Sequence, residues 1–153
     1  MNVENSNSFP DYYLRGITSM ENLDDSGLPL AGLFKFSEDR SSINNPEYNE
    51  ESINWYDCED SLDLILKQRK EKKGLDVIQF KFGVAQMNLN DLKKVVDLSY
   101  IGNEILRYER QVIDGNPYHG NLLLKKDVPK PKMLRIAAAI ALGCFKVIEN
   151  PNK

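Results

Sequence analysis

The chain has 153 residues, of which 41% are hydrophobic and 28% are charged, and its formal net charge is −3 at pH 7. This size and balance fit one globular domain with a real core and exclude wholesale disorder. The small negative charge gives no overall attraction to nucleic acid or to an anionic membrane, so a basic surface would have to be local.

The start of the chain is polar, and we expect residues 1–10 to be frayed and residues 11–150 to form a single domain. The first residues contain neither the basic nor the apolar stretch of a signal peptide, so the expected location is the cytoplasm. Two cysteines, Cys58 and Cys144, are too few for a disulfide framework.

The first half of the sequence shows strand and loop patterns. Aromatic and β-branched residues predict a strand over residues 11–18, and residues 33–36 have the character of a second, short strand. The polar stretch 37–49 contains Asn-Asn-Pro and indicates a loop. Apolar and polar residues then alternate over 51–56, as in a strand with one buried face.

A first helix is expected at about residues 61–73. Ser61 would cap it, acidic residues come early and basic residues late, and Gly74 follows as a terminator. The run 67–73 is the densest basic cluster of the chain. We interpret this run as the solvated end of the helix, with phosphate contact as the alternative.

A second helix is expected at about residues 131–148, after Pro129, whose missing N–H costs nothing at a helix start. The segment is apolar nearly all round, but it is shorter than the roughly 20 residues of a membrane span. It is also interrupted by Arg135 and Lys146. We therefore expect a buried helix and no membrane anchor.

The remaining segments complete the predicted sheet. Strands are predicted over 77–84 and 122–124, whereas the stretch 88–108 fits either helix or strand, with strands favoured after Lys94. Strands mixed with two separate helices predict a single α+β domain with a mostly antiparallel sheet.

The only histidine, His119, lies in a turn sequence over residues 114–121 between two apolar runs. Imidazole exchanges its proton near neutral pH, so His119 is a candidate catalytic acid or base, or a contact to a phosphate or a base edge. Asn116 and Tyr118 of the same turn are candidate ligand-binding residues. The plainer interpretation is a turn histidine that hydrogen-bonds local backbone.

Two of the predicted strands carry further candidates. Arg15 interrupts an apolar and aromatic strand just before Gly16, so it reaches solvent, meets a carboxylate or lines a ligand cleft, and an outward-facing strand arginine is favoured. Ser52 and Asn54 share the polar face of a later strand, where alternation alone also places polar residues. Arg15 and Ser52 join His119 as candidate catalytic residues, and Asn54 is a candidate ligand-binding residue.

Several chemistries lack their sequence signature. The chain has no Gly-x-Ser-x-Gly turn of a hydrolase and no glycine-rich phosphate loop with its lysine. Zinc sites take three or four His, Cys or carboxylate ligands, and this chain offers one histidine and no paired cysteines. We therefore expect no metal and no cofactor.

Short motifs also occur in a recognisable order, namely Leu14–Gly16, Gly27–Pro29 with Phe34, Glu51–Trp55, and Asn116–Leu122 before an alanine-rich helix. This order resembles a group of small uncharacterised prokaryotic proteins with an arginine strand, a Ser-Val/Ile-Asn/Asp strand and a late Pro-x-His-Ala/Gly turn. The resemblance covers most of residues 12–145, and the chain departs from it by a longer polar insert at 40–49. It implies no activity, only that Arg15, Ser52 and His119 converge, which is reminiscent of ADP-ribosyltransferase-like sites without their glutamate.

We expect a small cytosolic binding or accessory module with a protein partner, such as a subunit of a prokaryotic defence or toxin–antitoxin assembly. The grounds are a missing catalytic set and a missing cofactor fingerprint. The alternative is an enzyme or ligand-binding protein that acts on a nucleotide-like or phosphorylated substrate through Arg15, Ser52 and His119. Nucleic-acid binding is disfavoured by the acidic balance. The sequence leaves the oligomeric state open.

Overall fold

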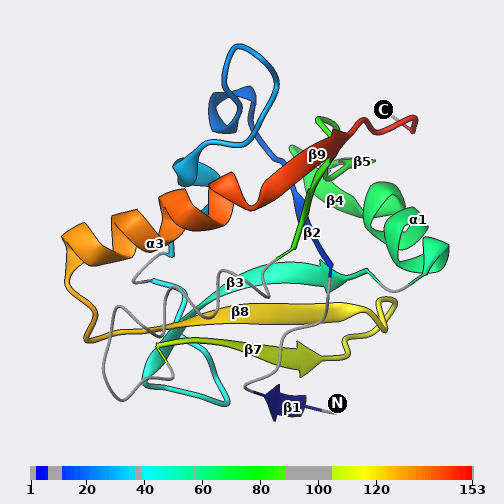
Figure 1. Ribbon diagram of the computed structural model, residues 1–153. Coiled ribbons are helices and arrows are strands. Elements are labelled where there is room, and N and C mark those ends of the chain that lie inside the picture. The colour runs from blue at the N-terminus through cyan, green and yellow to red at the C-terminus, as the bar shows by residue number, and fades with distance from the viewer. Residues whose placement is uncertain (1–2, 7–11, 37–38, 57, 89–104, 153) are drawn as a thin grey trace.

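The computed structural model describes residues 3–6, 12–36, 39–56, 58–88 and 105–152. Within these ranges the chain is a single α+β domain, as predicted, and its main feature is an antiparallel sheet (Figure 1). Seven of the described strands form this sheet, in the order β1-β7-β8-β3-β2-β6-β9. Their bounds are Val3–Ser6 (β1), Tyr13–Gly16 (β2), Tyr48–Trp55 (β3), Val84–Met87 (β6), Leu106–Gln111 (β7), His119–Lys125 (β8) and Cys144–Ile148 (β9).

The remaining described elements are two α-helices, two short 3₁₀ helices and a separate hairpin. Their bounds are Met20–Asn22 (η1), Ala31–Phe34 (η2), Glu59–Lys67 (α1), Arg69–Lys72 (β4), Leu75–Ile78 (β5) and Lys130–Leu142 (α3). In Figure 1 α3 lies to the left and α1 to the right of the strands. The hairpin β4–β5 forms a two-stranded sheet of its own next to α1.

Successive residues of a strand point to opposite faces, so the sheet has two distinct sides. The larger core cluster lies on the side covered by η2 and α3, which we call the α3 face, and includes Tyr13, Ile53 and Ile140. The smaller cluster joins Leu14 to Ile65 on the other side, the α1 face. Neighbouring residues of β2 thus belong to different cores, which follows from the period of two.

The predicted first helix is too long. α1 ends at Lys67, and the basic run that follows is strand β4, paired with β5 from Arg69 to Lys72. Lys73 and Gly74 form the two-residue loop, with φ of 53° and 80°. Positive φ at both loop positions is the geometry of a tight hairpin turn, so Gly74 turns a hairpin instead of ending a helix.

The predicted second helix is also too long at its C-terminal end. α3 stops at Leu142, and residues 144–148 form β9, which pairs with β6 at the edge of the sheet. The apolar run over 131–148 therefore combines a helix with a strand. Both bury apolar side chains, which is why periodicity alone did not separate them.

Three other expectations differ from the structure. Val3–Ser6 pairs with β7 as β1, in place of a frayed end. The strand expected over 33–36 is replaced by the 3₁₀ helix η2. The strand expected over 77–84 is split between β5 and β6, and of the ambiguous stretch 88–108, residues 89–104 lie outside the described residues.

Candidate functional site

A strip of polar side chains runs along the α1 face where β3 lies beside β8. Ser52 pairs with Asn121, and Asn54 pairs with His119, in the antiparallel register. Because partners in such a register share a face, these four side chains lie on the same side of the sheet. The predicted alternation of the β3 residues is therefore confirmed as a polar row on one face.

A pocket of about 200 Å³ opens at the end of this strip. Four of the six candidate residues from the sequence line it: Ser52, Asn54, Asn116 and His119. Tyr118 is not among the lining residues, and its hydroxyl accepts a hydrogen bond from Cys58 Sγ at 3.4 Å. The structure thus gathers most of the predicted site around one hollow.

Arg15 is separated from this pocket by the sheet itself. It follows Leu14, which pairs with Asn54, so the Arg15 side chain projects to the α3 face. Its guanidinium bonds Glu51 Oε2 at 2.5 Å and the carbonyl oxygens of Ser52 and Leu33 at 2.6 and 3.3 Å. The expected convergence of Arg15 with the side chains of Ser52 and His119 is therefore wrong.

The ion pair of Arg15 with Glu51 is largely shielded from water. The two side chains are 18% and 6% exposed. Burial raises the pKa of the Glu51 carboxyl and lowers the pKa of Arg15, and each partner's charge opposes that shift in the other. Through these bonds the pair holds β2 and β3 together under η2.

His119 is fixed in one tautomer by its neighbour strand. Its Nδ1 lies 2.9 Å from the carbonyl oxygen of Gln111, so Nδ1 carries the hydrogen. Burial lowers the pKa of the imidazole, while the Gln111 carbonyl and the Glu109 charge oppose that shift. Among the described residues, the second ring nitrogen, Nε2, has no hydrogen-bond partner. A neutral ring with Nε2 as an acceptor is the result.

Asn54 and Asn116 form a rigid amide pair in the wall of the pocket. Asn116 Nδ2 donates to Asn54 Oδ1 at 2.8 Å, and Asn54 Nδ2 donates to the Ser61 carbonyl at 3.3 Å. The two residues are 2% and 3% exposed. Because these amides satisfy each other and the backbone of α1, they shape the pocket more than they offer free hydrogen-bonding groups.

Sequence reasoning missed the buried carboxylate beside this strip. Glu109 of β7 is 1% exposed and accepts hydrogen bonds from Asn45 at 2.7 Å and from Asn121 at 2.9 Å. Arg40, from the same insert as Asn45, donates to Ser52 Oγ at 3.2 Å. The polar insert therefore folds over the strip. The register of a β7–β8 hairpin would have placed Glu109 opposite Asn121.

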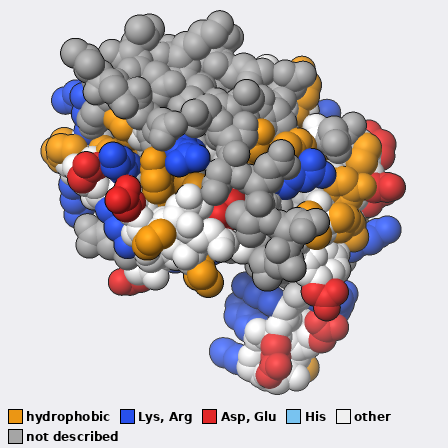
Figure 2. All heavy atoms as spheres, turned by 90° about the horizontal axis from the view of Figure 1, so that it is seen from below, with side chains coloured by type: hydrophobic (Ala, Val, Ile, Leu, Met, Phe, Trp, Pro, Cys, Tyr) orange, Lys and Arg blue, Asp and Glu red, His pale blue; other side chains and the backbone are white. Residues whose placement is uncertain are grey.

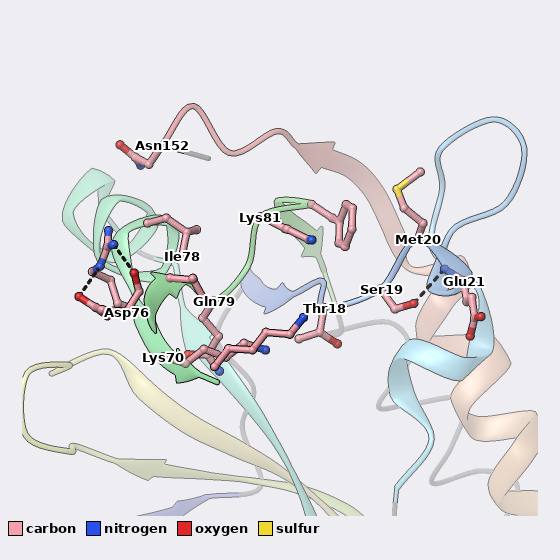
Figure 3. Close-up of a pocket in the computed structure, with 14 residues that line it drawn as sticks. Thr18, Ser19, Met20, Glu21, Lys70, Asp76, Ile78, Gln79, Lys81 and Asn152 are labelled. Carbon is pink, nitrogen blue, oxygen red and sulfur yellow. Dashed lines mark hydrogen bonds and ion pairs between the residues drawn. The ribbon is translucent and has the colours of Figure 1, made fainter. Parts of the chain in front are cut away.

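A larger groove, which the sequence did not suggest, adjoins the β4–β5 hairpin and encloses about 810 Å³. Figure 3 shows the hairpin residues Lys70 and Asp76, with Gln79 just after β5, on one side, and Ser19 and Glu21, before and within η1, on the other. The sequence did not suggest this groove because a helix over 61–73 was predicted there. Such a helix would have distributed the lysines around its circumference.

Most of the charged side chains that line this groove are basic: Arg69, Lys70, Lys72 and Lys81, against Glu21 and Asp76. Arg69 is bound to Asp76 at 2.8 Å in an exposed ion pair, which leaves the lysines for other contacts. Figure 2 shows Lys or Arg and Asp or Glu side chains interspersed on the face seen from below. With a formal net charge of −3 for the whole chain, the positive character of the groove is local.

The groove and the pocket are neighbours. Gln79 lines both hollows, and the pocket-lining residues Gln68 and Phe80 directly adjoin the groove-lining residues Arg69 and Lys81 in the chain. The two hollows therefore lie on either side of the segment 79–81, with Gln79 as their shared boundary.

Comparisons with known proteins gave no match to this chain. No protein-family model, curated protein or solved structure matches it. Within the described ranges, no group of three or more His, Cys, Asp and Glu side chains is arranged to hold a metal ion. None of the helices in those ranges has the length and apolar content that crossing a bilayer requires.

Proposed function

We propose that this protein is a binding module that holds an acidic segment of a protein partner in the groove beside the β4–β5 hairpin. The observation that carries the proposal is the set of lysines Lys70, Lys72 and Lys81 around a groove of about 810 Å³. That volume is within the range of roughly 300–1,000 Å³ typical of ligand sites. Carboxylates are the groups that such a lysine cluster attracts.

An acidic protein segment suits the groove better than nucleic acid does. Glu21 and Asp76 line it too and would repel a continuous row of phosphates. The groove's aromatic ring, Phe82, already has the Lys81 ammonium 5.0 Å from its centre. Single-stranded nucleic acids favour open aromatic platforms as well as a basic track. A peptide with spaced carboxylates matches the mixed lining.

The catalytic alternative receives less support from the geometry. It needs Arg15 to hold an anion beside Ser52 and His119, but the guanidinium lies on the opposite face and is occupied by Glu51. His119 Nδ1 is bonded to a backbone carbonyl, whereas a Ser–His hydrolase directs that nitrogen at a carboxylate. The binding module is therefore the stronger of the two hypotheses.

The proposal is tested by the affinity of a fluorescein-labelled octaglutamate peptide, measured by fluorescence anisotropy. We expect binding that weakens with salt and falls by about tenfold or more in the Lys70→Glu/Lys72→Glu variant, because two attractive charges become repulsive. Lys70→Glu alone should already weaken binding, and Lys130→Glu, which makes the same single charge change, is its control, since Lys130 is an exposed residue at the start of α3. A labelled single-stranded DNA of the same charge is the competing probe.

Either of two results would overturn the proposal. One is the same affinity for octaglutamate in the wild type, the hairpin variant and the Lys130→Glu control. The other is tighter binding of the DNA than of the peptide at the same salt concentration. Circular dichroism and thermal unfolding of each variant show that the fold is intact before affinities are compared.

A further inference from the structure

The pocket next to the groove has apolar walls and several polar lining residues, of which Ser52 and His119 belong to the strip on β3 and β8. Ile65, Phe80 and Ile113 contribute apolar surface, while Ser52 and His119 contribute polar atoms. Its volume of about 200 Å³ is close to the size of a single aromatic ring, since a cavity of roughly 150 Å³ holds benzene. The pocket is therefore large enough for one aromatic side chain and too small for most free ligands.

The polar positions differ in what they offer. His119 donates through Nδ1 to the Gln111 carbonyl, so its Nε2 is an acceptor with no partner among the described residues. Ser52 Oγ accepts from Arg40 at 3.2 Å, which leaves the serine hydroxyl hydrogen to donate. One acceptor and one donor are what a phenolic hydroxyl needs, because it donates and accepts at the same oxygen.

One wall of the pocket is held in place by Gly16. A Cβ added to Gly16 would lie 2.2 Å from the Phe80 ring, so this ring rests directly on the backbone of β2. Phe80 also packs on the cluster around Leu14 and Ile65. A wall fixed in this way loses little freedom when a second ring packs against it, which favours tight binding.

We propose that this pocket anchors a tyrosine side chain carried by the acidic segment bound in the groove, with its hydroxyl donating to His119 Nε2 and accepting from Ser52. The inference rests on the proposed function, because the segment reaches the pocket past Gln79, which lines both hollows. Tyrosine is among the residues that most often dominate the energetics of protein interfaces.

The test uses three nine-residue peptides: nonaglutamate and two versions with tyrosine or phenylalanine at the central position. We expect the tyrosine peptide to bind about tenfold more tightly than the phenylalanine peptide, as one well-placed hydrogen bond predicts. The His119→Ala variant should remove this preference, and Ser52→Ala should reduce it. In both variants, nonaglutamate should keep its wild-type affinity.

The outcomes separate the two proposals. Equal affinities for the tyrosine and phenylalanine peptides in the wild type would overturn the anchor pocket and leave the groove standing. A tyrosine preference that persists in both His119→Ala and Ser52→Ala would also overturn it. Failure of all three peptides to bind would overturn the proposed function itself. Binding of p-cresol, but not toluene, to the wild-type protein in ligand-observed NMR checks the pocket without the peptide.

Discussion

Arg15 and His119, on opposite faces of the sheet, use their polar groups in opposite ways. On the α3 face, the Arg15 guanidinium is directed entirely at Glu51 and at two backbone carbonyls, under η2. On the α1 face, His119 keeps one nitrogen without a partner among the described residues and lines a pocket that adjoins an open basic groove. Satisfied polar groups stabilise a fold, whereas groups with spare hydrogen-bonding capacity are available to a ligand.

Polar residues that stabilise the fold are in this way separated from polar residues that are open to a ligand. Substitutions on the α3 face should change stability, and substitutions around the groove should change binding.

Glu51→Ala should destabilise the protein by about 3–5 kcal/mol, because it leaves the Arg15 charge buried without its partner. Urea denaturation followed by circular dichroism measures this change. The double variant Arg15→Met/Glu51→Leu should recover much of the loss, since an apolar pair removes both buried charges. A Glu51→Ala variant as stable as the wild type would contradict the assignment of this ion pair to the core.

Gly16→Ala should cost about 1–3 kcal/mol, since the new methyl group would overlap the Phe80 ring, 2.2 Å from its nearest atom, and force it away. Gly32→Ala is the control, because its Cβ would meet only Asn22 Oδ1 at 3.4 Å. We expect the control to stay within about 0.5 kcal/mol of the wild type in the same urea titration. Equal stability of both variants would contradict the close packing of this wall.

His119 should make the protein less stable as the pH falls. Burial lowers the pKa of His119 below its usual 6.5, so the unfolded chain takes up the proton first. The contribution of the neutral His119 ring to the free energy of unfolding is therefore fully present above pH 6.5. It is lost as the pH falls from that value to the lower pKa of the folded state. Glu109 and Arg40 act on this ring in opposite directions and set how far the window extends.

Urea denaturation at pH 7.0 and 5.5 measures this dependence. Because His119 is the only histidine, the His119→Gln variant should lose the histidine part of the decline. The raised pKa values of Glu50 and Glu51 act in the opposite direction, and they remain in both proteins, so the comparison cancels them. The same pH dependence in the wild type and in His119→Gln would show that this ring does not titrate as described.

The hairpin substitutions should have the smallest effect on stability. Lys70 and Lys72 are fully on the surface and form no ion pair with another described residue, so Lys70→Glu/Lys72→Glu should change the free energy of unfolding by about 0.5 kcal/mol or less. Its effect on octaglutamate affinity should nevertheless be large. Loss of stability in parallel with loss of binding would remove the distinction between the two regions.

The fold class followed from the sequence, but the extent of its helices did not. Strands and helices were recognised from periodicity and composition, which are local properties. The end of α1 depended on whether Gly74 caps a helix or turns a hairpin, and glycine suits both. That choice was made by the pairing of β4 with β5, a contact that local propensity does not contain.

The sequence predicted only part of the candidate site, again because local patterns do not contain tertiary contacts. Alternation placed Ser52 and Asn54 on one face, and the strand register brought them to His119. Arg15 was misplaced because the sequence gives the alternation of residues along β2 but does not say which of its two faces is covered by α3 and which by α1. The groove could not be foreseen, because it exists only where the hairpin stands opposite residues 18–21.

The most direct test of the account is to map the octaglutamate contact by NMR, from backbone amide shifts in a ¹⁵N-labelled sample. We predict that the largest shifts fall within the segments 18–21 and 69–82, which supply most of the groove lining, and that α3 is unaffected. Shifts concentrated on α3, or no shifts at a peptide concentration of several millimolar, would contradict it.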